Sequence, residues 1–352
     1  MTEYLQQIKK EILLHIDKSF DNYRETFKNL DKWSDDSFLR LSRFISRGKL
    51  IRGGLVAASY RALGKEETEK ILSIAASIEL LHAGFLMHDD VMDGDLLRRG
   101  EPAIHVAYRD MLYKKNCQHH VKNGESFAIC LGNIAYFLAF DFIADSGFDS
   151  DTANKLNRTL NREAVITGFG QMNDIYIAAS NMIPKEDSIL NTYRMKTARY
   201  TFSLPLTLSA ICAGLSDNTI NKLIKIGEEI GTVFQLRDDE LNIFGETEGT
   251  GKSVGSDISE GKKTLIFSML IKNISDKEKK DVDALFSKKP VSKIEIETLR
   301  KIIIESGTLK SHRKLISEIS LKTETMIEKL DLDISYKELL NSILKLSFER
   351  KY

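Results

Sequence analysis

Only four prolines occur in this chain of 352 residues, Pro102, Pro184, Pro205 and Pro290. Because proline ends or kinks a helix, such scarcity leaves long stretches that are free to be helical. Within these stretches apolar residues recur at intervals of three and four, as in the run from Ile71 to Leu81, which is the spacing of one helix face. Runs in which apolar and polar residues alternate, the pattern of a β-strand, occur only as weak candidates. The pattern predicts an all-α protein with long helices.

The composition fits one folded domain. Hydrophobic residues make up 42% of the chain and charged residues 29%, which excludes a disordered chain because enough apolar surface is present to bury. No stretch rich in Pro, Gly and Ser divides the sequence. We therefore expect residues 1–352 to form a single large helical bundle, with amphipathic C-terminal helices at about residues 276–352 packed on its core.

Charge and targeting signals narrow the function classes. The 51 Lys and Arg residues balance the 51 Asp and Glu residues, so no overall basic field favours nucleic acid. The first residues lack the pattern of a signal peptide. The most apolar window, Ala128–Ala144, contains Asn133 and Asp141, which favours a buried helix over a membrane span. Three scattered cysteines suit a reducing compartment, and we expect a cytoplasmic protein without a membrane span.

Two acidic clusters are the strongest chemical signal in the chain. The first runs from Asp89 to Asp93 with the letters DDVMD, and the second from Asp238 to Asn242 with the letters DDELN. In a helix the first and fifth positions share one face, where two carboxylates repel each other. A divalent cation reverses that repulsion, and Mg²⁺ is commonly held by one or two carboxylates together with substrate phosphates. A solvated acidic helix end is the alternative for either cluster taken alone.

Basic residues near the clusters favour a diphosphate ligand. The pair Arg98 and Arg99 follows the first cluster, and paired guanidinium groups suit phosphate oxygens. A second basic group contains Lys49 and Arg52. The segment Cys117–His120 is a further metal candidate, but no fourth zinc ligand is evident. Carboxylates, a divalent cation and arginines together indicate a site for diphosphates.

With these residues assembled, the chain resembles the trans-isoprenyl diphosphate synthases, also called polyprenyl synthetases. The segment Asp89–His105, DDVMDGDLLRRGEPAIH, is similar to the first aspartate-rich motif of that family with its trailing arginine pair. The segment Phe234–Gly245, FQLRDDELNIFG, is similar to the second, and it is followed by Gly251–Leu265, GKSVGSDISEGKKTL. The resemblance extends from about Gly48 to Lys263. Two motifs in the family's order with matching flanks are far more specific than either alone.

The resemblance implies a fold, a reaction and a cofactor. The fold is a helical bundle around a deep central cavity, the isoprenoid synthase fold, in a homodimer. The reaction is the head-to-tail condensation of isopentenyl diphosphate with an allylic diphosphate, which ionises, is attacked by the isopentenyl double bond and loses a proton. The cofactor is Mg²⁺, about three ions for each site with substrate bound. Metal ions and fixed cations stabilise charge on the leaving diphosphate, and a dry cavity protects the carbocation.

The same resemblance implies roles for individual residues. The Mg²⁺ ligands are Asp89, Asp93 and Asp238, supported by Asp90 and Asp239. The residues that hold the allylic diphosphate are Arg98, Lys196 and Lys252, with Lys262 near it. The residues that hold isopentenyl diphosphate are Lys49, Arg52, His82 and Arg99. The residues that line the reaction zone are Gln171, Asp174, Thr197, Tyr200 and Gln235. The residues expected to be catalytic are Asp89, Asp93, Arg98, Lys196, Asp238 and Lys252.

Three positions depart from the family pattern. Asn242 stands where an aspartate is usual, so the second cluster offers a neutral oxygen there and weaker metal binding is expected. Gly53 stands where proline is usual after Arg52. Asn133 stands where aspartate is usual after Gly132, and we do not assign Asn133 to the site.

The residues just before the first cluster bear on product length. The family resemblance makes this helix one wall of the pocket for the growing chain. Phe85, four residues before Asp89, is bulky, whereas Gly84 is small and would open the pocket. We expect a medium-length product, geranylgeranyl diphosphate first and farnesyl diphosphate second. Ordinary core packing is the alternative role for Phe85.

Two other functions remain open from the sequence. A terpene cyclase or head-to-head synthase shares the helical fold and the diphosphate chemistry but needs no site for isopentenyl diphosphate. A non-catalytic or regulatory subunit of a heteromeric synthase would be expected to lose aspartates from the first motif, and this chain keeps all three. Asn242 is the only feature that points toward such a subunit.

Overall fold

Helices make up nearly all of the described structure. The computed structural model describes residues 2–30, 33–180, 182–245, 258, 261–286 and 291–349. Within these segments the only strands are the two-residue β1 (Leu97–Arg98) and β2 (Glu101–Pro102). The prediction of an all-α protein is therefore confirmed. The chain forms two compact units, and its organisation as a single domain stays a prediction.

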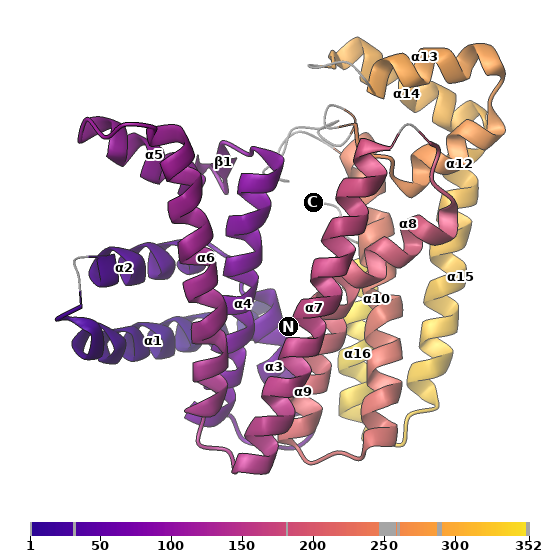
Figure 1. Cartoon of the computed structure of the whole chain (residues 1–352). Coiled ribbons are helices and arrows are strands. Elements are labelled where there is room, and N and C mark those ends of the chain that lie inside the picture. Colours follow the sequence, from indigo (N-terminus) through magenta and orange to yellow (C-terminus); the bar gives the residue numbers. More distant parts are fainter. Residues whose placement is uncertain are drawn as a thin grey trace. The chain divides into compact units, whose positions relative to one another are not determined.

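The first unit contains residues 1–161 and 208–215. Its helices are α1 (Thr2–Phe27), α2 (Trp33–Ser46), α3 (Ile51–Ala62), α4 (Glu69–Asp93), α5 (Ile104–Lys114) and α6 (His120–Ala144), with the first part of α7 (Ser150–Ala179) and the last part of α9 (Leu204–Cys212). The central helix is α4, because α1, α2, α3, α5 and α6 all pack against it (Figure 1). The apolar face predicted from Ile71 to Leu81 is buried there.

Two helices of this unit, α4 and α6, are apolar enough to cross a membrane by length and composition alone, the only two among the residues that the structure describes. The core helix of a globular protein passes the same test. In α4, 72% of the most apolar window is buried inside the protein, and in α6, 44% is buried. The prediction of no membrane span is kept, because this signal is weak.

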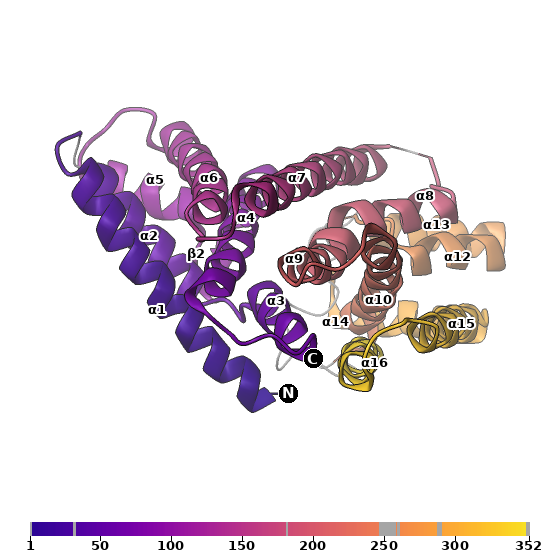
Figure 2. The ribbon, with the colours of Figure 1, turned by 90° about the horizontal axis from the view of Figure 1, so that it is seen from below.

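The second unit contains residues 162–207 and 216–352. Besides the remaining parts of α7 and α9, its helices are α8 (Glu186–Tyr193), η1 (Arg194–Ser203), α10 (Asp217–Phe244), α12 (Leu265–Asn273), α13 (Asp276–Phe286), α14 (Lys293–Glu305), α15 (Thr308–Glu328) and α16 (Ile334–Phe348). The central helix is α10, because α8, η1, α12, α14, α15 and α16 pack against it. Figure 2 shows α15 and α16 side by side next to α10.

Local sequence signals explain where two of these helices begin. Ser216 caps α10, since its side chain accepts a hydrogen bond from the backbone nitrogen of Thr219, as N-cap serines do. Ser292 and Glu295 form a reciprocal capping box at the start of α14, which satisfies two backbone donors. No comparable signal marks η1, a ten-residue π-helix between α8 and α9.

His312 makes the stability of the second unit depend on pH. Its side chain on α15 is fully buried, its Nε2 donates to the carbonyl oxygen of Leu236 at 3.0 Å, and its Nδ1 is buried without a hydrogen-bond partner. Burial lowers the pKa of His312 below 6.5. The unfolded chain therefore binds this proton at a higher pH than the folded chain. Folding free energy present above pH 6.5 is lost as the pH falls below it, by up to about 1.4 kcal/mol per pH unit.

We expect the melting temperature to fall as the pH drops below about 6.5. The variant His312→Gln keeps an amide donor for Leu236 but binds no proton, so it should weaken that dependence. His120→Gln, at a position that is less buried, is the control and should behave as the unmodified protein does. Thermal unfolding followed by circular dichroism at several pH values measures both, and identical pH dependence in the two variants would contradict the assignment.

Candidate active site

The first acidic cluster lies at the end of α4. The last helical residue is Asp93, and Gly94 follows in the left-handed conformation with a φ of 70°, which glycine adopts without strain. Asp89 and Asp93 are therefore one helical turn apart at this helix end. Both carboxylates share the face on which the sequence predicts a metal ion.

Asp90, between them, holds the first arginine of the pair. It is fully buried, and its Oδ1 accepts a hydrogen bond from Nε of Arg98 at 2.6 Å. Nη2 of Arg98 donates to the same oxygen and, at 3.2 Å, to Oδ2 of Asp95. Burial raises the pKa of Asp90 to about 6, and the hydrogen bond from Arg98 acts in the opposite direction. Asp90 thus orients Arg98, and a direct metal contact of Asp90 stays a prediction.

A tight hairpin presents the second arginine. Strands β1 and β2 pair antiparallel with Arg98 opposite Glu101. Arg99 and Gly100 form the turn with φ values of 54° and 77°, both left-handed as in a type I′ turn. Nη1 of Arg99 donates to the carbonyl oxygen of Phe44 at 3.1 Å, which fixes the turn against α2. This hairpin was not predicted from the sequence, although Gly100 is the signal for its turn.

Residues expected to hold isopentenyl diphosphate lie near one another in the first unit. The pKa of His82, on α4, lies well below 6.5 because of burial and the positive charges of Arg52, Arg99 and Arg98. His82 is therefore neutral near pH 7 and can donate one hydrogen bond to a phosphate oxygen. The structure brings Arg52, His82 and Arg99 together, while Lys49 is exposed just before α3.

Glu79 supports the cluster of Arg52, His82 and Arg99, and this role was not predicted from the sequence. Its side chain is buried on α4, and its Oε1 accepts a hydrogen bond from the backbone nitrogen of Gly53 at 2.7 Å. A proline at this position could not donate, because it lacks the N–H. Glu79 therefore fixes the first turn of α3, which carries Arg52. The signal in the sequence is a lone acidic residue within the apolar run Ile71–Met87.

Phe85 and Tyr136 form a wall one turn before Asp89. Their rings, from α4 and α6, pack edge to face with centroids 5.3 Å apart. Tyr136 also covers Gly84, where an added β-carbon would lie 2.4 Å from Cε1 of the tyrosine. This corrects the expectation that Gly84 opens the pocket, because the space beside it is filled by a ring. Tyr136 was not predicted from the sequence, because it lies 51 positions from Phe85 and is recognised only by its packing.

The second unit contains a pocket of about 240 Å³ around the second acidic cluster. It is lined from α7, α8, η1, α10 and the segment before α12. The expected site residues that line it are Asp174, Lys196, Thr197, Gln235, Asp238, Asp239 and Lys262. Asn242 lines it as well, whereas Gln171 and Tyr200 do not. Lys252 lies outside the described residues.

Asp239 is held from two sides within this pocket. The hydroxyl of Tyr193 donates to Oδ2 of Asp239 and accepts from the backbone nitrogen of Leu265 at 3.0 Å. Nε2 of Gln235 donates to Oδ1 of Asp239 at 3.2 Å. Asp239, 3% exposed, therefore links α10 to the start of α12 through Tyr193. A metal contact of Asp239 stays a prediction, and nothing in the sequence identified Tyr193.

Lysines contribute positive charge to the same pocket. Nζ of Lys196 lies 2.5 Å from Oδ2 of Asp174, and both side chains remain partly exposed. Such a pair is able to exchange its carboxylate for a phosphate oxygen of a ligand. Lys263 also lines the pocket, but its Nζ donates to the carbonyl oxygens of Ser180 and Met182, which ties the segment before α12 to the end of α7.

Mg²⁺ fits the donors of the two clusters better than zinc does. Among the residues that the structure describes, which include Cys117–His120, no three His, Cys, Asp or Glu side chains are grouped to hold a metal. Mg²⁺ needs only one or two carboxylates, since substrate phosphates and water complete its shell. Asp89 and Asp93 meet that requirement at a helix end, and Asp238 with the neutral Asn242 offers a weaker set.

Comparison with known proteins agrees with this chemistry. The family profile described as polyprenyl synthetase matches residues 39–303. A short chain isoprenyl diphosphate synthase of Methanocaldococcus jannaschii is 31% identical over 84% of this chain and 82% of that protein. A geranylfarnesyl diphosphate synthase of Aeropyrum pernix is 30% identical over 86% of this chain and 90% of that protein.

A solved structure is similar over almost the whole chain. It is a geranylgeranyl pyrophosphate synthase from Corynebacterium glutamicum, complexed with isoprenyl diphosphate and magnesium. The TM-score is 0.89 at 28% identity, with 98% of this chain and 99% of that chain covered. The fold is therefore the isoprenoid synthase fold. The chain belongs to the polyprenyl synthetase family and is a prenyltransferase.

Proposed function

We propose that this chain catalyses the Mg²⁺-dependent head-to-tail condensation of isopentenyl diphosphate with an allylic diphosphate. The observation that carries the proposal is the pocket in the second unit, which gathers the carboxylate of Asp238 and the ammonium groups of Lys196 and Lys262. Carboxylates and cations side by side suit a metal-bound diphosphate. The complex of the Corynebacterium relative with isoprenyl diphosphate and magnesium supports the same ligands.

The roles proposed for individual residues follow the family resemblance. When bound, Mg²⁺ would act as a Lewis acid and neutralise part of the negative charge of the diphosphate. The residues that bind the allylic diphosphate and stabilise the charge that develops as its C–O bond breaks are Arg98, Lys196, Lys262 and the predicted Lys252. The residues that orient isopentenyl diphosphate for attack on the allylic carbon are Lys49, Arg52, His82 and Arg99. The released diphosphate is the proposed acceptor of the final proton.

For product length we propose geranylgeranyl diphosphate first and farnesyl diphosphate second. The wall made by Phe85 and Tyr136 supports a limit to chain growth, because Phe85 lies one turn before Asp89 and its ring packs against that of Tyr136. The Corynebacterium relative, a geranylgeranyl pyrophosphate synthase, agrees with this proposal. Geranylfarnesyl diphosphate is a longer alternative product, because the relative from Aeropyrum pernix is a geranylfarnesyl diphosphate synthase.

The requirement for isopentenyl diphosphate separates this proposal from its competitors. A terpene cyclase or head-to-head synthase would consume an allylic diphosphate supplied alone, and the cluster of Arg52, His82 and Arg99 would then have no substrate. We expect no release of inorganic diphosphate from farnesyl diphosphate alone, and stoichiometric release when isopentenyl diphosphate is added. Release at an equal rate without isopentenyl diphosphate would favour a cyclase or head-to-head synthase and contradict the proposal.

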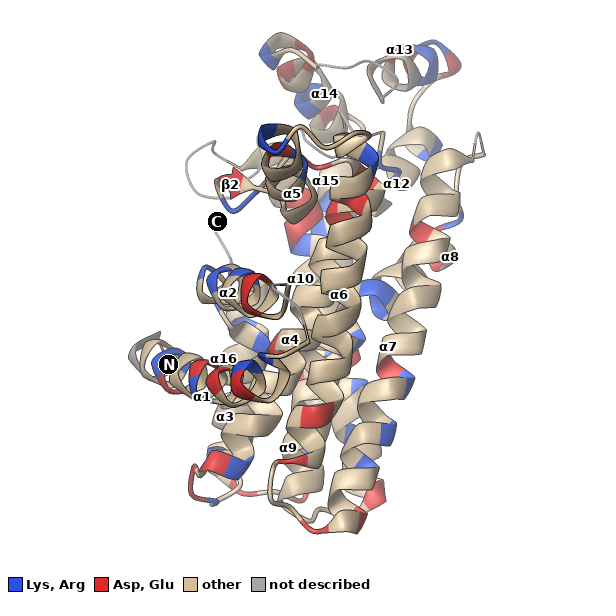
Figure 3. Cartoon of the chain, turned by 60° about the vertical axis from the view of Figure 1, so that its left-hand side comes forward, with Lys and Arg blue, Asp and Glu red and all other residues tan. Residues whose placement is uncertain are grey.

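We further propose that the protein works as a homodimer in the cytoplasm. On α6, which is nearly free of charged residues (Figure 3), Phe137 is 70% exposed, and Ile129 and Ile134 are each 38% exposed. On α7, Phe169 and Met172 are 59% and 67% exposed. On each of these helices the exposed apolar side chains mark a candidate interaction surface, and a second copy of this chain is the proposed partner.

Light scattering should therefore report about twice the 39.9 kDa of one chain. The variant Phe137→Asp is expected to shift the protein toward the monomer, because a buried charge without a partner is costly. Leu14→Asp, at a site on α1 that is also 70% exposed, is the matched control and should leave the dimer intact. A monomeric unmodified protein would contradict the proposal.

A further inference from the structure

The lysine that faces the diphosphate pocket lies on an unusual element. Lys196 and Thr197 both line the pocket and both belong to η1, the ten-residue π-helix Arg194–Ser203. π-helices are rare, are seldom longer than one turn and occur frequently at functional sites. Because the α-helical form is ordinarily preferred, contacts from outside η1 must hold it in its π form.

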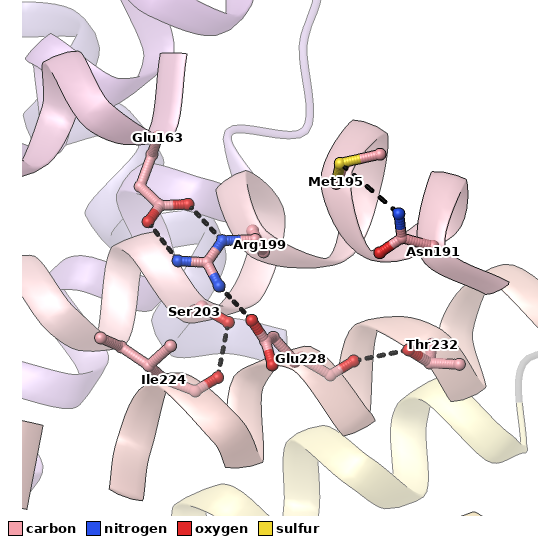
Figure 4. A network of polar contacts seen from close by, with 8 residues as sticks. All are labelled: Glu163, Asn191, Met195, Arg199, Ser203, Ile224, Glu228 and Thr232. Atoms are coloured by element: carbon pink, nitrogen blue, oxygen red, sulfur yellow. Dashed lines mark hydrogen bonds and ion pairs between the residues drawn. The ribbon is translucent and has the colours of Figure 1, made fainter. Parts of the chain in front are cut away.

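Arg199 supplies the strongest of these contacts. Its Nε and Nη2 donate to the two carboxylate oxygens of Glu163 at 2.9 and 2.6 Å, and its Nη1 donates to Glu228. Glu163 lies on α7 and Glu228 on α10, so a single guanidinium joins η1 to both neighbours (Figure 4). The side chains of Arg199, Glu163 and Glu228 are only 20%, 9% and 23% exposed. Forked, partly buried pairs of this kind are stronger and more directional than surface ion pairs.

Close backbone packing holds η1 on the same two sides. A β-carbon on Gly170 of α7 would lie 2.5 Å from the backbone nitrogen of Lys196. One on Gly231 of α10 would lie 2.4 Å from Cα of Ala198. The backbone of η1 is therefore in contact with α7 and α10 directly beside Lys196, and Arg199 closes the same three-helix junction with ion pairs.

We infer that Arg199 is a positioning residue, which holds η1 in its π form and so directs Lys196 into the diphosphate pocket. The inference rests on the proposed function of that pocket. A residue lost from or added to a helical turn rotates the flanking side chains by roughly 100° about the helix axis. If η1 rewound into an α-helix, Lys196 would turn away from Asp174, which its ammonium now contacts at 2.5 Å. Arg199 therefore acts on the substrate through Lys196.

The first test is Arg199→Lys, which keeps the positive charge but loses the fork that engages Glu163 and Glu228 together. We expect kcat to fall by about 10²-fold, the usual cost of a misplaced catalytic group. The KM for the allylic diphosphate should rise, while the KM for isopentenyl diphosphate stays unchanged, because its expected ligands lie in the first unit. A merely structural residue would lower the melting temperature and the amount of active protein but would leave both KM values unchanged.

Neighbouring glutamates on α10 provide a matched control. Glu228 pairs with Arg199, whereas Glu229 pairs with Lys322 of α15 at 2.7 Å. The same change, Glu to Gln, is therefore available at adjacent positions with different partners. Glu228→Gln should follow Arg199→Lys in its allylic KM, and Glu229→Gln should behave as the unmodified protein. Equal effects of the two changes would overturn the inference.

Binding of inorganic diphosphate in the presence of Mg²⁺ provides a test that needs no turnover. Isothermal titration calorimetry should show weaker binding for both Lys196→Ala and Arg199→Lys. In the double variant, Arg199→Lys should cause no further loss, since its effect acts through Lys196. Independent, additive losses would overturn the inference. Failure of the unmodified protein to condense its substrates would instead refute the proposed function, and normal turnover with additive losses would refute only the role of Arg199.

Discussion

Replacing Asp89 with alanine is expected to lower kcat on the order of 10³-fold while leaving the protein folded. Metal ions supply several kcal/mol of charge stabilisation, and each 1.36 kcal/mol corresponds to about a tenfold change in rate. Asp89 shares its helix face with Asp93, and two like charges at this spacing destabilise a helix. Removing one of them relieves this repulsion, so the variant should stay folded.

The measurement is incorporation of labelled isopentenyl diphosphate as a function of Mg²⁺ concentration. Asp110→Ala is the matched control, since this carboxylate on α5 is 51% exposed and pairs only with Arg109 among the ion pairs of the described chain. The control should retain the rate and the Mg²⁺ dependence of the unmodified protein. Unchanged turnover in Asp89→Ala would rule out the metal assignment at the first cluster.

Replacing Phe85 with alanine is expected to lengthen the dominant product by at least about one C5 unit. Phe85 lies one turn before Asp89, and its ring is held against Tyr136. Truncating a ring to a methyl group removes a large apolar volume that packing replaces only in part. The proposed pocket for the growing chain would gain this volume, so chain growth should continue further before it meets a wall.

Product analysis by chromatography of the hydrolysed prenyl alcohols measures this effect. Phe148→Ala is the control. Phe148 is also half-buried, but it lies in the loop after α6, where its ring contacts the ammonium group of Lys70. The control should give the product of the unmodified protein. An unchanged distribution in Phe85→Ala would remove Phe85 from the pocket, and a product of six or more isoprene units from the unmodified protein would refute the wall itself.

Short-range patterns were enough to predict the helices and the acidic clusters. The apolar spacing from Ile71 to Leu81 and the i, i+4 spacing of Asp89 and Asp93 are properties of one helix, and both follow directly from its periodicity. The resemblance to the family rested on such local motifs, and the family was confirmed. Seven of the residues expected in the site line one pocket of the second unit, whereas Gln171 and Tyr200 do not.

Contacts between distant segments were beyond the reach of such patterns. Glu79 meets Gly53 across 26 positions, and Tyr193 meets Asp239 across 46. Arg199 of η1 meets Glu163 of α7 across 36 positions and Glu228 of α10 across 29. Gly84 was interpreted as open space because Tyr136, which fills it, lies far along the chain. Tertiary packing, rather than local propensity, decides each of these features.

The central claim is that this chain alone condenses isopentenyl diphosphate with an allylic diphosphate by means of Mg²⁺. The most direct measurement incubates the purified protein with labelled isopentenyl diphosphate and farnesyl diphosphate, with Mg²⁺ or with a chelator. We predict labelled geranylgeranyl diphosphate with Mg²⁺ and no labelled product with the chelator. The absence of any labelled product from the lone protein with Mg²⁺ would contradict the claim and favour a subunit that needs a catalytic partner.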